Sequence, residues 1–141
     1  WVEPLAQVLQ QLGSQHVLVV HSQDGLDEIS IAAPTWVAEL HQGQLTTYQL
    51  APEDFSINRA NLKEIQVQSV TESATLIKKV LDNQTGPARD IVLLNAGAAI
   101  YTAGLTENIA QGICQTQTVL NNGAARDKLT ALINLTQSFS A

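Results

Sequence analysis

The spacing of apolar residues divides this chain into a strand-rich first part and a helical second part. Between Leu5 and Leu12, apolar residues recur every three or four positions, behind Pro4 and before Gly13, which predicts a short helix. The next apolar run, residues 17–20, is β-branched and too short for a helix, so it predicts a buried strand.

Further extended segments follow this strand. Residues 28–31 begin a second short extended piece after a polar turn. Residues 35–41 and 44–50 are rich in β-forming residues and are joined by Gln42-Gly43, so they predict a β-hairpin with a tight turn. The first part of the chain therefore supplies about four short strands.

The second part of the chain shows helical periodicity. Ser69 and Glu72 have the spacing of a capping box, and Thr106 is predicted to cap a later helix. Between these caps, a run that is apolar almost all round predicts a central helix, and its Gly97 indicates close approach by a neighbouring element. The predicted helices span residues 69–83, 89–103, 106–120 and 124–139.

This order of elements predicts an α/β fold. Three or four strands with several helices make half of an α/β layer arrangement rather than a complete one. We therefore expect residues 1–141 to be part of a larger α/β domain, with a parallel sheet that needs further strands to be complete.

The charge of the chain excludes two classes of partner. Thirteen acidic residues outnumber seven basic ones, which gives a net charge of −6, and the basic residues are scattered. Nucleic acids and anionic membranes are bound chiefly through clustered Lys and Arg, so we expect neither as a partner.

Other sequence features indicate a cytoplasmic location. No apolar run approaches the ~20 residues that span a bilayer, and the start of the chain shows no signal-peptide pattern. Cys114 is the single cysteine and forms no internal disulfide, which suits a reducing compartment. Its apolar neighbours predict that its thiol is buried.

The first candidates for chemistry are the adjacent carboxylates Asp27 and Glu28. They come just after the buried strand at residues 17–20, and open α/β sheets present their ligand sites beyond the ends of such strands. Carboxylate oxygens suit a hard divalent cation, and a site with only two of them suits Mg²⁺, which keeps several waters. A solvated acidic turn without a ligand is the alternative interpretation.

Other polar residues give weaker signals. His21 ends the first strand and is either a base beside the carboxylates or a hydrogen-bonded strand end. Asn95 either bonds a loop of the active face or holds buried backbone. The histidines and Cys114 lack zinc-ligand spacing, so we expect no structural zinc. The chain also contains no Gly-rich phosphate loop, nucleophile elbow or Walker lysine.

Four segments of the chain together resemble a known family. They are, in order, VVHSQDGLDEIS, PEDF, VLDNQTGPARDIVLLNAGAAIYTAG and NNGAARDKLTALI. They resemble the C-terminal part of bacterial anthranilate phosphoribosyltransferases, and GLDE and GPARDIVLLNA are the most specific portions. The resemblance implies the nucleoside phosphorylase and anthranilate phosphoribosyltransferase fold, with residues 1–141 as the C-terminal portion of its large α/β domain.

The resemblance also implies a function. Members of this family transfer the phosphoribosyl group of phosphoribosyl pyrophosphate to the amine of anthranilate in tryptophan biosynthesis, and they work as homodimers formed through an N-terminal helical domain. Their Asp-Glu pair, which matches Asp27 and Glu28, binds Mg²⁺. The cation neutralises the pyrophosphate leaving group as its bond to the ribose breaks.

The chain departs from the family pattern at several positions. Ser22 and Ser56 stand where family members usually have glycine, and Val67-Gln68 replaces a common Gly-Gly pair. The family's Gly-rich pyrophosphate loop, anthranilate-contacting residues and helical domain precede this region, so we expect these residues alone to be inactive. A catalytically silent relative that acts as a binding module and a pyrimidine nucleoside phosphorylase relative remain alternatives.

Overall fold

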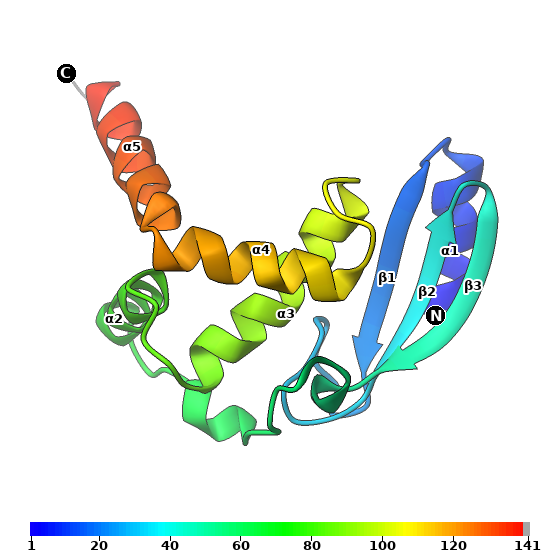
Figure 1. Ribbon diagram of the computed structural model, residues 1–141, viewed down its shortest axis with the longest axis horizontal. Helices are drawn as coiled ribbons and strands as arrows, with labels where there is room; N and C mark the ends of the chain where they lie inside the picture. The colour runs from blue at the N-terminus through cyan, green and yellow to red at the C-terminus, as the bar shows by residue number, and fades with distance from the viewer. Residues whose placement is uncertain (140–141) are drawn as a thin grey trace.

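The computed structural model describes residues 1–139 and consists of a small sheet followed by a group of helices (Figure 1). The sheet and the first helix lie at one end, α3 and α4 cross in the middle, and α5 ends far from the sheet. The elements are α1 (Val2–Gln11), β1 (His16–Ser22), β2 (Thr35–His41), β3 (Gln44–Leu50), η1 (Pro52–Phe55), η2 (Leu62–Ile65), α2 (Val70–Leu81), α3 (Pro87–Thr102), α4 (Ile109–Asn121) and α5 (Ala124–Ser138).

The predicted α/β fold is confirmed, but the direction of the predicted sheet is wrong over the described residues. The order is β1-β2-β3, and both pairs are antiparallel. No helix crosses over between successive strands, and parallel pairing requires such a connection. The predicted hairpin is confirmed: Gln42 and Gly43 both have positive φ, at 51° and 79°, as a two-residue hairpin turn of type I′ requires.

The strand predicted at residues 28–31 is not formed. The backbone N–H of Ile29 donates to the Asn95 side chain, and that of Ser30 donates to the Thr35 hydroxyl. Side chains therefore satisfy the backbone groups that a neighbouring strand would otherwise pair, and the segment remains irregular although Ile29 and Ile31 are buried.

The hydrophobic core joins the sheet to α3 and α4. The prediction that α3 is the central helix is confirmed, since Leu93 and Leu94 are almost fully buried and α3 packs against α4, α2 and β1. The buried apolar residues of this core are Ile29, Ile31, Val37, Leu50, Leu93, Leu94, Ala98, Ile109, Ile113 and Leu120.

The closest approach between elements occurs where α3 crosses α4. A Cβ atom on Gly97 would lie 2.7 Å from the backbone nitrogen of Ile113, and a Cβ on Gly112 would collide with the Gly97 carbonyl. The close approach predicted at Gly97 is therefore confirmed. The two glycines allow the helix backbones to meet without an intervening side chain.

The helix starts differ in how well they match the predicted caps. Ser69 caps α2 as predicted, because its hydroxyl oxygen accepts from the N–H of Glu72 at 3.1 Å. The prediction for Thr106 is wrong: α4 is capped by Asn108, whose side chain accepts from the N–H of Gln111. The turn that follows α3 delays the helix start, and the Thr106 hydroxyl donates to the Asn108 carbonyl instead.

Cys114 is exposed, so the prediction of a buried thiol is wrong. It lies on a different face of α4 from Gly112 and Ile113, and this face turns away from the core. Within residues 1–139, no helix combines the length and the apolar character needed to cross a membrane.

We predict that Gly112→Ala destabilises the intact protein by about 1–3 kcal/mol, because overpacking outweighs the better helix propensity of alanine. Urea unfolding measures this loss. Gln115→Ala, at an exposed position of the same helix, is the control and should change the free energy of unfolding by less than about 0.5 kcal/mol. A neutral or stabilising Gly112→Ala would contradict the close contact between the helices.

Candidate functional site

The loop that follows β1 carries the predicted site residues and is folded by its own polar groups. The N–H of Ser22 donates to the Leu26 carbonyl at 2.9 Å, and the N–H of Gly25 donates to the Ser22 carbonyl at 3.0 Å. Gly25 has a φ of +91°, a conformation that side chains rarely adopt. These bonds turn the chain back directly after the strand ends.

Asp24 stabilises this loop from within. Its carboxylate accepts from the Ser30 hydroxyl at 2.6 Å and from the N–H of Leu26 at 3.1 Å. Partial burial alone would raise the pKa of Asp24, but hydrogen bonds led by the one from Ser30 outweigh it, so its pKa lies below the usual range. Asp24 is therefore an ionised structural group.

Asp27 and Glu28 lie on the outer side of this loop. Both side chains are exposed, while the flanking Leu26 is partly buried and Ile29 is buried. Within residues 1–139, neither carboxylate accepts a hydrogen bond or forms an ion pair, unlike Asp24 in the same loop. They are accessible and free to bind a cation, and their role as metal ligands stays a prediction.

Asn95 on α3 fixes the backbone next to Glu28. Its amide nitrogen donates to the Ile29 carbonyl at 2.8 Å, and its amide oxygen accepts from the Ile29 N–H at 2.9 Å. The same nitrogen also donates to the Ile91 carbonyl at 3.0 Å. The prediction that Asn95 holds backbone is therefore confirmed, and that backbone belongs to the loop of Asp27 and Glu28. That this loop is part of an active face stays a prediction.

Ser30 and Thr35 support the same loop, and no sequence signal pointed to either residue. Both are fully buried. The Ser30 hydroxyl donates to Asp24 and accepts from the N–H of Ala32 at 2.9 Å. Hydroxyl residues spaced closely around a loop are common in sequences, so only the fold distinguishes these two from surface residues.

A groove runs beside the loop, between β1 and α3. It has a volume of about 500 Å³. Leu18, Val20 and Ile29 form one wall, and Asn95 and Ala98 form part of the other. His21 is exposed and, by the alternation of side chains along a strand, lies on the other face of β1 from Leu18 and Val20, so it does not line this groove.

Ser22 and Ser56, at positions where the resemblance implies glycine, have different backbone conformations. Ser56 has a φ of 57°, a left-handed conformation in which glycine is more favourable. Ser22 is fully buried, has no positive φ, and donates its hydroxyl hydrogen to the Pro34 carbonyl at 3.3 Å. The substitution at Ser56 therefore costs backbone strain, whereas Ser22 adds a hydrogen bond that ties the two ends of the acidic loop together.

Comparisons with known proteins agree with this architecture. The model of the glycosyl transferase family α/β domain matches residues 1–126. The anthranilate phosphoribosyltransferase of Methylococcus capsulatus is 57% identical over 141 residues, which are the whole of this chain and 41% of that protein. The chain thus spans about two fifths of the length of the curated relatives that it matches.

Solved structures show the same fold. The crystal structure of anthranilate phosphoribosyltransferase from Thermus thermophilus matches with a TM-score of 0.80 and 35% identity, over 89% of this chain and 37% of that chain. A variant of the Saccharomyces cerevisiae enzyme with Mg bound matches with a TM-score of 0.81 and 26% identity, over 94% of this chain and 38% of that chain. With its family model matched over nearly all of its length, the chain belongs to the glycosyl transferase family, as part of the family's α/β domain.

Proposed function

We propose that the protein is an anthranilate phosphoribosyltransferase of tryptophan biosynthesis. The observation that carries this proposal is the 57% identity, over the whole chain, to an enzyme of that name. In the reaction, the amine nitrogen of anthranilate forms a bond to the anomeric carbon of the ribose, the bond from that carbon to the pyrophosphate oxygen breaks, and the amine loses a proton.

Within this reaction we assign Asp27 and Glu28 to magnesium. Both are exposed and lack protein partners within residues 1–139, and carboxylate oxygens are the ligands that Mg²⁺ prefers. The similarity to a yeast enzyme solved with Mg bound supports the assignment. When bound, the ion neutralises charge on the pyrophosphate leaving group.

The remaining residues of the loop hold these carboxylates in position. Asn95 fixes the backbone of Ile29 to α3, and Asp24 closes the inner side of the loop on Ser30. The fold therefore orders this loop before any ligand binds, so binding does not require a further loss of conformational entropy in the loop. Such prior ordering allows the loop to position its ligands effectively. Asn95 and Asp24 act through the loop and are positioning residues.

The rest of the machinery is proposed to come from parts of the protein outside residues 1–141. We assign the Gly-rich pyrophosphate loop, the anthranilate contacts and the helical domain that forms a homodimer to those parts, with residues 1–141 as the C-terminal portion of the α/β domain. The exposed apolar residues Leu5, Val8 and Leu12 on α1 support this proposal, because they form a row that a further element can cover. These residues alone should then be inactive.

The proposal includes a cytoplasmic location. Cys114 is free and exposed, and such a thiol stays reduced in a reducing compartment.

The strained Ser56 favours a second candidate function, a diverged relative with reduced activity. Steady-state turnover of the protein with phosphoribosyl pyrophosphate and anthranilate separates the two.

We predict that the double variant Asp27→Asn, Glu28→Gln lowers turnover at limiting Mg²⁺ by about 10²–10³-fold, because it removes the charges that hold the ion. The free energy of unfolding should change by less than about 0.5 kcal/mol, since both side chains are exposed. Glu3→Gln with Asp127→Asn removes the same charges elsewhere and should retain full activity. An unchanged magnesium requirement in the first variant would exclude these residues as ligands.

We predict that Asn95→Ala raises the Mg²⁺ concentration for half-maximal activity by about tenfold, the usual cost of losing a supporting group behind a metal ligand. Ile113→Val is the control, because it weakens the same core by about 0.5–1.5 kcal/mol while leaving the hydrogen bonds of Asn95 in place. Kinetics at varied Mg²⁺ make the comparison. If both variants show the same dependence of activity on Mg²⁺, Asn95 has a purely structural role and does not position the metal ligands.

A further inference from the structure

A second cluster of ligand-type side chains lies at the opposite end of β1 from the Asp27 and Glu28 loop. His16 and His41 are directly opposed across β1 and β2, and Glu39 lies two residues before His41 on the same face. We name His16, Glu39 and His41 the histidine–glutamate cluster. One nitrogen or oxygen atom from each residue lies within 4.8 Å of the other two.

The distance between His16 and Glu39 matches the separation of two ligands around a small ion. His16 Nε2 lies 3.1 Å from Glu39 Oε1. Two ligands on one tetrahedral zinc ion are separated by about 3.3 Å, because each metal–ligand bond is about 2.0–2.1 Å long. A metal ion can therefore replace the proton between His16 and Glu39 with little movement of either side chain.

Two tyrosines hold the carboxylate of Glu39 in place. Tyr101 of α3 donates to Oε1 at 2.6 Å, and Tyr48 of β3 donates to Oε2 at 2.8 Å. Burial would raise the pKa of Glu39, but the hydrogen bonds from Tyr101, Tyr48 and His16 outweigh it, so its pKa lies below the usual range. Burial and its bond to Glu39 raise the pKa of Tyr101 to about 12, so it remains a donor. Such outer partners orient metal-binding carboxylates.

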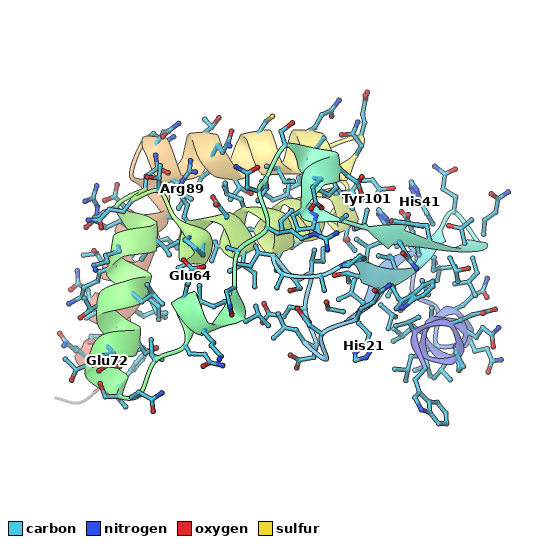
Figure 2. All side chains as sticks on the ribbon, turned by 90° about the horizontal axis from the view of Figure 1, so that it is seen from below. His21, His41, Glu64, Glu72, Arg89 and Tyr101 are labelled. Atoms are coloured by element: carbon cyan, nitrogen blue, oxygen red, sulfur yellow. The ribbon has the colours of Figure 1, made fainter. Side chains whose placement is uncertain are left out.

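The cluster is open to solvent on the side of His41. His41 is exposed, and a cavity of about 280 Å³ lies beside it, lined by Glu39, Gln42 and Tyr101 among others. Figure 2 shows His41 and Tyr101 near each other and well away from His21. The rings of His16 and His41 are stacked, with centroids 4.2 Å apart. His41 must therefore rotate out of the stack to share an ion, and its exposure leaves room for that rotation.

We propose that His16, Glu39 and His41 form a binding site for a late first-row transition-metal ion of the Zn²⁺ class, separate from Asp27 and Glu28. Two imidazoles and one carboxylate suit zinc, copper or nickel, whereas Mg²⁺ takes oxygen ligands and keeps its waters. Three protein ligands leave a fourth position for water. The bound ion would fasten the start of β1 to the end of β2 and thereby stabilise this end of the sheet.

The test is zinc binding to the intact, tag-free protein in competition with a chromophoric chelator, in excess Mg²⁺. We expect one zinc ion per chain at this site, and its affinity should fall as the pH is lowered, because protons compete with the metal for its ligands. His41→Gln should weaken binding at least about tenfold. His21→Gln removes an exposed histidine from the same sheet and should leave the affinity unchanged. Circular dichroism confirms that both variants are folded.

Copper provides a second, independent readout. The electron paramagnetic resonance spectrum of the bound Cu²⁺ should show coupling to two imidazole nitrogens, and His41→Gln should reduce this to one. Absence of zinc binding in the unaltered protein, equal affinity in His41→Gln, or displacement of zinc by Mg²⁺ would each overturn the proposal. Loss of binding in His21→Gln would do the same, because it would place the ion elsewhere.

Discussion

The paired hydrogen bonds between the Asn95 side chain and the backbone of Ile29 are the constraint on which the arrangement of the candidate site depends. They join α3, the central helix, to the loop that leaves β1, and they replace the strand pairing that this loop lacks. A buried backbone without such partners would cost about 1–3 kcal/mol for each unsatisfied group. The loop is therefore fixed at Ile29, while the neighbouring Asp27 and Glu28 remain exposed.

Local signals in the sequence were sufficient for much of the fold. Gly43 indicated the hairpin because glycine readily adopts the positive φ of a tight turn, whereas Gln42 adopts a φ of 51° without such a signal in the sequence. Ser69 indicated the start of α2 through its side-chain cap. Thr106 failed as a cap because the turn after α3 postpones the helix to Asn108, a tertiary effect that local spacing does not encode. The burial predicted for Cys114 failed because the apolar residues around it belong to a different face of α4.

The two candidate sites also differ in how far the sequence alone could predict them. Asp27 and Glu28 are adjacent in sequence and follow a recognisable strand, so the sequence alone could propose them. His16 and Glu39 lie far apart in the chain, and only the antiparallel register of β1 and β2 brings them together with His41. Ligand-spacing rules describe metal sites built on one local segment, and they missed this cluster because its geometry comes from strand pairing. The protein thus presents an oxygen-only donor pair on the loop after β1 and a nitrogen-rich donor set at the other end of β1.

We propose that the main role of the loop held by Asn95 is to present Asp27 and Glu28 to a hard divalent cation. The most direct measurement is a crystal structure of the intact protein with Mn²⁺ and phosphoribosyl pyrophosphate, because manganese shares the oxygen preference of magnesium and is located by its anomalous scattering. We predict an anomalous peak within about 2.2 Å of carboxylate oxygens from both residues. A fully occupied manganese ion bound with pyrophosphate but distant from both carboxylates would contradict this role.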